Sequence, residues 1–184
     1  MEAELADILR QLDSVDAALK RVVDGLAHEQ LLWRPGAKKW SITECFDHLA
    51  IVDSMDLPGF RSAAAEARKG GATGRGPFRY GVLSGWFVSA MEPPVRRFKA
   101  SSPGRYISRD AVDPSEVFRR FFTVHEELRA FIVEADGVDL ARVKVRSPVG
   151  PAGLKMSLGR RLQLIAAHDR RHVWQAEQVR RALP

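Results

Sequence analysis

Three histidines have the residue type and the spacing that metal chemistry needs. His168 and His172 are four residues apart, so in a helix they lie one turn apart on the same face. His48 lies in an earlier amphipathic segment, on the side that also carries Val52 and Met55. Two imidazoles from one helix and a third from a facing helix bind one divalent ion and leave a coordination position open. The spacing therefore makes His48, His168 and His172 candidate ligands of one metal ion.

The same pattern has a simpler interpretation, in which each histidine is a hydrogen-bonded residue of the core. Three imidazoles buried together would then each need a partner of their own, whereas one ion satisfies all three. This difference in cost favours the metal site.

His125 occupies an apolar position of another helix and has two open interpretations. It is a candidate catalytic acid or base near the metal, or a core histidine with a hydrogen-bond partner.

Further residues near these histidines have less specific signals. Glu44 and Asp169 are placed to orient a ligand imidazole, although Glu44 is already explained as part of a helix cap. Cys45 is a candidate soft ligand, but a small core residue is the simpler interpretation. Three tryptophans are expected to pack the interior and are also candidates for a wall of the site: Trp33, Trp40 and Trp174.

Four amphipathic helices are expected to position these residues, because their apolar residues recur at spacings of three and four. We expect the first over residues 3–23 and the last over 157–182. The second begins at Ser41, which forms a capping box with Glu44, and is kinked or ended by Pro58-Gly59. The third begins at Asp113, with proline in its first turn.

The segments between these helices are rich in turn-forming residues. Residues 69–112 are expected to hold a short helix at 81–91, and residues 141–146 are the one strand-like stretch. The resulting prediction is an all-α chain, one domain over residues 1–184, folded as a four-helix bundle with a long crossover between helices 2 and 3. Residues expected in the core are Leu12, Leu49, Phe121 and Ile165.

Composition excludes several classes of protein. A hydrophobic fraction of 45% and a charged fraction of 28% are typical of a globular chain. The single cysteine forms no internal disulfide, and the acidic, amphipathic start differs from a signal peptide. No apolar run reaches the roughly 18 residues of a membrane span. We therefore expect a cytoplasmic protein. The net charge is +6, but the basic residues are scattered or in short doublets, so no nucleic-acid partner is expected.

Two segments carry a resemblance to a known family. The segment WSITECFDHL, residues 40–49, and the segment AHDRRHVWQ, residues 167–175, resemble the helix-2 and helix-4 motifs of the DinB-like superfamily. The resemblance covers nearly the whole chain. It implies an up-down-down-up order of the helices and a divalent metal, often zinc or nickel, at His48, His168 and His172.

An ion with three histidine ligands and an open position suits two enzyme activities, because it lowers the pKa of a bound thiol or water. The resemblance implies the first, since members of the superfamily include thiol-dependent isomerases and transferases that use low-molecular-weight thiols such as mycothiol, bacillithiol and glutathione. A small-molecule substrate and a thiol cofactor are therefore expected, the thiol near Arg160, Arg161 or Arg171. A metal-dependent hydrolase is the alternative, and a non-catalytic protein with a structural metal is a third. A homodimer is a further expectation.

Overall fold

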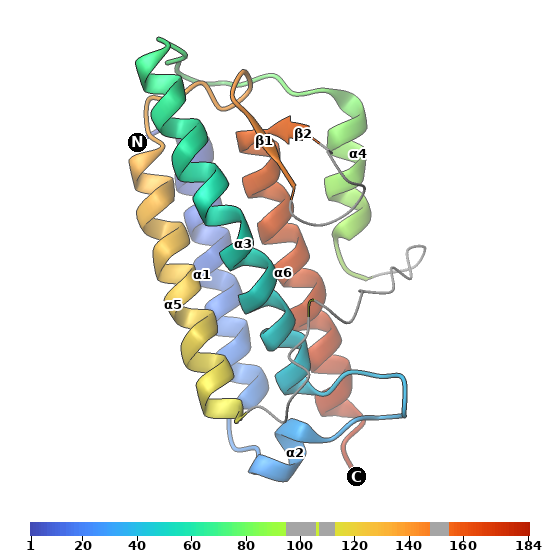
Figure 1. Ribbon diagram of the computed structural model, residues 1–184. Helices are drawn as coiled ribbons and strands as arrows, with labels where there is room; N and C mark the ends of the chain where they lie inside the picture. The colour runs from blue at the N-terminus through green and yellow to red at the C-terminus, as the bar shows by residue number, and fades with distance from the viewer. Residues whose placement is uncertain (95–105, 107–112, 148–154) are drawn as a thin grey trace.

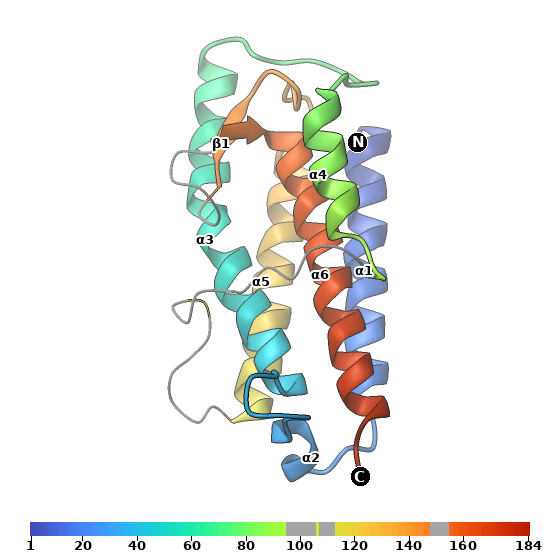
Figure 2. The same cartoon turned by 90° about the vertical axis from the view of Figure 1, so that its right-hand side faces the viewer.

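Four long helices run side by side and form the bundle (Figures 1 and 2). The computed structural model describes residues 1–94, 106, 113–147 and 155–184. The long helices are α1 (Ala3–Val23), α3 (Ile42–Lys69), α5 (Pro114–Glu134) and α6 (Leu158–Arg181). In Figure 1, α1 and α6 descend, whereas α3 and α5 both ascend. The prediction of an all-α, up-down-down-up bundle is confirmed.

Two of the long helices, α3 and α5, begin at the capping residues that the sequence predicts. The Ser41 hydroxyl accepts a hydrogen bond from the Glu44 N–H at 3.2 Å, and the Glu44 carboxylate accepts one from the Ser41 N–H at 2.8 Å. The Asp113 carboxylate accepts a hydrogen bond from the Ser115 N–H at 2.7 Å, and Pro114 follows at the first helical position. These caps fix the start of α3 and α5.

The structure decides one open detail of the second predicted helix and corrects another. The sequence left open whether Pro58-Gly59 kinks or ends this helix, and α3 continues past the proline to Lys69. Phe60 and Ala64 are fully buried beyond the proline, so packing of this last part outweighs the lost hydrogen bond. Met55, expected on the apolar face, is 44% exposed. The helix is rotated so that Asp53 and Asp56 face the interior in its place.

The interior has two apolar clusters. One contains Leu12, Leu128 and Ile165, and the other contains Leu49 and Phe121. All four residues expected in the core are buried. Buried polar residues lie between the two clusters along the helices: Asp53, His125, Asp169 and His172. The bundle therefore has a polar layer at mid-height.

The connections contain three smaller features. Helix α2 (His28–Leu32) lies in a segment for which the sequence suggested only a connection. Helix α4 (Val82–Met91) matches the predicted short helix and packs against α6. Strand β1 (Lys144–Arg146) lies within the strand-like stretch and pairs antiparallel with β2 (Lys155–Ser157), Val145 opposite Met156. Among the described helices, none has both the length and the apolar character that a membrane crossing requires.

Candidate metal centre

His48, His168 and His172 converge in the polar layer. The Nε2 atom of His168 lies 3.4 Å from Nε2 of His48 and 3.2 Å from Nε2 of His172. One ligand nitrogen from each ring lies within 4.8 Å of the other two. The sequence-predicted ligands from α3 and α6 are thus brought together as expected.

The spacing of these nitrogens fits a shared ion. Nitrogens bound to one tetrahedral ion at about 2.0–2.1 Å lie about 3.3 Å apart. The Nδ1 atom of His48 donates a hydrogen bond to the backbone carbonyl of Tyr106 at 2.9 Å. Because a carbonyl only accepts, Nδ1 carries the hydrogen and the Nε2 lone pair faces the other two histidines. The donor set therefore suits a divalent ion that binds imidazole, such as zinc or nickel.

The electrostatics of the centre keep the three rings neutral. Burial lowers the pKa of His48, against the opposing effects of the Tyr106 carbonyl and of the Asp47 and Asp169 charges. Burial also lowers the pKa of His168 and His172 well below the usual value, and the neighbouring histidines lower them further. A neutral imidazole is the form that binds a metal. The rings are thus in the ligand form at neutral pH.

The indole of Trp40 forms one wall of the centre. It stacks on His172, with ring centroids 5.4 Å apart and planes inclined by 23°, and lies 5.0 Å from the ring of His48. Trp40 immediately precedes the Ser41 cap of α3, so the start of the helix fixes its position. This wall was one of two roles that the sequence left open for Trp40.

The comparisons with known proteins concern the family and the fold. The family model described as the DinB superfamily matches residues 11–176. The chain belongs to the DinB superfamily. The solved structure of YfiT from Bacillus subtilis, reported as a probable metal-dependent hydrolase with an unusual four-helix bundle topology, has a similar fold. It is 16% identical with a TM-score of 0.62, and the match covers 98% of this chain and 89% of YfiT. None of the curated protein sequences compared with this chain matches it.

Two other sequence candidates in this DinB protein have different contacts. Cys45 is fully buried, and burial, with a further contribution from the Glu44 charge, raises the pKa of its thiol. Cys45 belongs to the apolar cluster that contains Leu49 and Phe121, so it packs as a small core residue. The carboxylate of Glu44 accepts hydrogen bonds from Arg34 and from the Ser41 N–H, so it acts in the helix cap.

The three arginines named as candidates for holding a cofactor have different surroundings. Arg161 is buried, and its Nε donates to Asp56 at 2.9 Å. Arg160 lies with its guanidinium carbon 4.8 Å from the ring centre of Tyr80. Arg171 contacts the sulfur of Met91, the last residue of α4, at 3.5 Å. The positive charge of Arg171 lowers the pKa of both His168 and His172, so Arg171 is the one whose charge acts on two ligands.

His125 does not join the three ligand histidines but forms a second cluster. Its Nδ1 is 2.6 Å from Oδ1 of Asp16, and its Nε2 faces Asp53 and Asp169. Sequence analysis missed Asp53 and Asp16. The available signal was an acidic residue at a core position of an amphipathic helix, since Asp53 lies one residue after the buried Val52.

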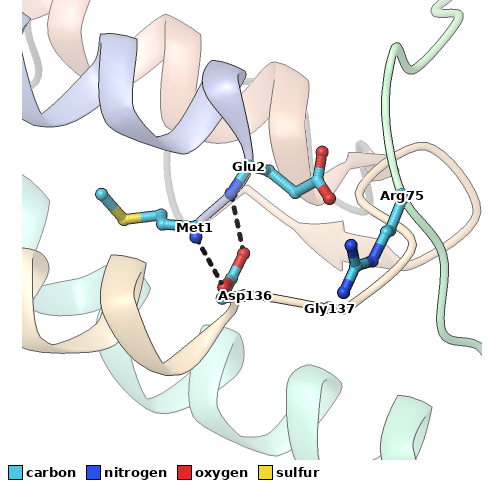
Figure 3. Close-up of a pocket in the computed structure, with 5 residues that line it drawn as sticks. All are labelled: Met1, Glu2, Arg75, Asp136 and Gly137. Carbon is cyan, nitrogen blue, oxygen red and sulfur yellow. Dashed lines mark hydrogen bonds and ion pairs between the residues drawn. The ribbon is translucent and has the colours of Figure 1, made fainter.

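Two surface pockets lie away from these clusters. One lies at the N-terminus and has a volume of about 320 Å³. Figure 3 shows its lining residues, which include Met1, Glu2, Arg75 and Asp136. The Met1 amino group lies 3.3 Å from the Asp136 carboxylate, which also accepts a hydrogen bond from the Glu2 N–H at 2.8 Å. The second pocket shares Glu2 with the first and is also lined by Phe78. These contacts tie the chain start to the end of α5, and we assign no ligand to them.

Proposed function

We propose that this DinB protein is a metal-dependent enzyme that transfers a low-molecular-weight thiol to an electrophilic small molecule. The observation that carries the proposal is the convergence of three imidazole nitrogens, from His48, His168 and His172, with no carboxylate among them. Three neutral ligands leave a divalent ion its full charge and one open coordination position. A bound ion of this kind lowers the pKa of a thiol or a water molecule that it holds.

The surroundings of the centre support a thiol as the nucleophile. Sulfur is a softer ligand than water, and zinc and nickel bind it well. In the transfer, the thiol loses its proton and its sulfur forms a bond to an electrophilic carbon. The bond from that carbon to the leaving group breaks, and the leaving group takes the electron pair. His168 is the ligand that is only partly buried, which supports access from its side.

Arg171 supports binding of an anionic thiol. Its guanidinium is half-buried on α6, one residue before His172, and its charge acts on two of the ligands. Glutathione and bacillithiol carry carboxylates, which arginine binds in a bidentate manner. Arg161 is a weaker candidate, because its guanidinium is engaged by the buried Asp56.

A metal-dependent hydrolase is the second candidate, and the fold similarity to YfiT favours it. In that reaction water replaces the thiol as the nucleophile, and an ester or amide carbonyl is the electrophile. The same three histidines would hold the ion. The two candidates differ in whether turnover needs a thiol.

The test is calorimetric titration of the zinc- or nickel-loaded protein with mycothiol, bacillithiol and glutathione separately. We expect one of them to bind with release of a proton, measured from the heat in buffers of different ionisation enthalpy. Arg171→Gln should weaken that binding about tenfold, as loss of one charge-assisted contact does, with the metal content unchanged. Thiol-independent, metal-dependent hydrolysis of an ester, with no thiol bound below millimolar concentration, would favour the hydrolase and contradict the transferase.

The metal requirement is tested by substitution of a ligand. His168→Ala should bind one metal ion per chain fewer than the wild type, and metal should raise its melting temperature less, because only the native state assembles the site. His28→Ala removes an exposed histidine from α2 and is the matched control. Metal content equal in the two variants would contradict the centre itself.

A further inference from the structure

A second group of potential metal ligands lies in the polar layer of the bundle. It consists of Asp53 from α3, His125 from α5 and Asp169 from α6. All three side chains are fully buried, with 0% exposure. One ligand atom from each lies within 4.8 Å of the other two. The group thus joins three helices in the interior.

Five of the six polar side-chain atoms of this group have no hydrogen-bond partner in the described part of the chain. Both carboxylate oxygens of Asp53, both of Asp169 and the Nε2 atom of His125 are buried without a protein donor or acceptor. Burial of an unpaired carboxylate costs several kcal/mol, so buried charges in proteins are paired or bind metals. The nearby Arg161 is engaged by Asp56, so its guanidinium does not satisfy these oxygens.

The spacing of the atoms leaves room for an ion. His125 Nε2 lies 3.6 Å from Oδ2 of Asp169 and 3.9 Å from Oδ2 of Asp53. These distances are too long for hydrogen bonds. Ligand atoms that share an ion at about 2.0–2.2 Å lie about 3–3.6 Å apart, so the two distances from His125 Nε2 are at or slightly above this range.

A hydrogen bond orients the imidazole toward this space. Asp16 Oδ1 accepts a hydrogen bond from Nδ1 of His125 at 2.6 Å. Asp16 is held in turn by Arg129, whose Nη2 lies 2.6 Å from Oδ2. A carboxylate on Nδ1 fixes the ring and makes the opposite nitrogen a better ligand, an arrangement common at metal-bound histidines. The free Nε2 is the atom that faces both aspartates.

We propose that Asp53, His125 and Asp169 form a second site for a divalent transition-metal ion, distinct from the centre at His48, His168 and His172. Two carboxylates neutralise the charge of the ion, and their oxygens with one imidazole suit manganese or zinc. Full burial makes this site a structural link between α3, α5 and α6. Asp169 directly follows His168 in the sequence, so the two sites share one turn of α6.

The alternative is a metal-free cluster in which Asp53 and Asp169 share a proton. Counting metal ions distinguishes the two. Apo-protein is incubated with Mn²⁺ or Zn²⁺, freed of excess metal, and measured by inductively coupled plasma mass spectrometry, with Mn²⁺ also followed by electron paramagnetic resonance. We expect two ions per wild-type chain and one in a variant with His48, His168 and His172 all changed to alanine.

Removal of one carboxylate tests the assignment to this site. Asp53→Asn preserves shape and should bind one ion per chain, and its combination with the triple histidine variant should bind none. A matched control, Asp56→Asn with Arg161→Met, removes another buried carboxylate of α3 together with its cation and should keep both ions. If the triple histidine variant binds no metal, or Asp53→Asn still binds two ions, the second site does not exist.

The outcome is separate from that of the proposed function. Circular dichroism checks the fold of each variant, and the count in the triple histidine variant does not require Asp53→Asn to fold. One ion lost with Asp53→Asn and one lost with the histidines supports both sites. If the wild type binds one ion, the triple histidine variant binds none and Asp53→Asn still binds one, then the second site does not exist and the first site stands.

Discussion

The guanidinium of Arg161 on α6 lies buried against the carboxylate of Asp56 on α3, with Nε 2.9 Å from Oδ1. Arg161→Ala would leave this carboxylate buried without a partner. We expect a loss of about 3–5 kcal/mol in the free energy of unfolding, measured by urea denaturation.

Substitution of both Arg161 and Asp56 distinguishes two causes of the lost stability: the burial of an unpaired carboxylate, and the loss of the attraction between the two charges. Arg161→Met combined with Asp56→Leu replaces both charges by apolar groups, which is often neutral or stabilising for a buried ion pair. We expect most of the stability to return in this double variant. A double variant as unstable as Arg161→Ala would show that the pair itself, rather than the uncompensated carboxylate, holds the two helices together.

Acid should affect the metal-free protein through the ligand histidines. Burial lowers the pKa of His48, His168 and His172 in the folded state. Below a pH of about 6.5 the unfolded chain binds protons at these rings that the folded chain does not bind. Their contribution is therefore complete above that pH and is lost as the pH falls, so metal-free protein should be less stable at pH 5.5 than at pH 7.5.

The same shift predicts how the metal is released. Because protons compete with the metal only near the lowered pKa values, the pH at which half of the zinc has left the three histidines should lie below 6.5.

The stability prediction is tested by urea denaturation of the metal-free chain at pH 5.5 and pH 7.5. Comparison with a variant that carries glutamine at all three histidine positions isolates the effect of these groups. An equal loss of stability in both proteins would assign the acid sensitivity to other residues.

The cap of α3 should affect both stability and the metal centre. Ser41→Ala removes the acceptor for the Glu44 N–H, and loss of such a cap costs about 1 kcal/mol. His48 lies two turns into this helix, and Trp40 on His172 directly precedes the cap. We therefore expect a lower melting temperature and weaker zinc binding. Ser41→Asp, which retains an acceptor, should restore both.

Gly159 allows the close approach of a tyrosine to the start of α6. A Cβ atom at this position would lie 1.9 Å from Oη of Tyr80, which is held by Glu4 at 2.6 Å. Gly159→Ala should therefore displace Tyr80 and cost about 1–3 kcal/mol, measured by thermal unfolding.

Two comparisons test the cause. At Gly59 in α3 an added Cβ meets no atom within 4 Å, so Gly59→Ala should stabilise the protein by up to about 1 kcal/mol. Tyr80→Ala combined with Gly159→Ala should cost no more than Tyr80→Ala alone. If the two substitutions add, the clash with Tyr80 is not the reason.

The parts of the structure that could be predicted from the sequence depend on interactions within single helices. Apolar spacing of three and four placed Leu12, Leu49, Phe121 and Ile165 in the core, and all four are buried. The Ser41 capping box needs only residues of the same helix. Likewise His168 and His172 share a face because helix geometry alone sets their spacing.

The tertiary structure decided what depends on the rotation and register of whole helices. Asp16, Asp53, His125 and Asp169 come from four helices, and no local pattern states that they meet at one level of the bundle. A single charged residue in a sequence is most often exposed, so the inward positions of Asp53 and Arg161 contradict the usual expectation. Arg161 is buried because Asp56 on another helix compensates its charge, and only the packed bundle brings such a partner into contact.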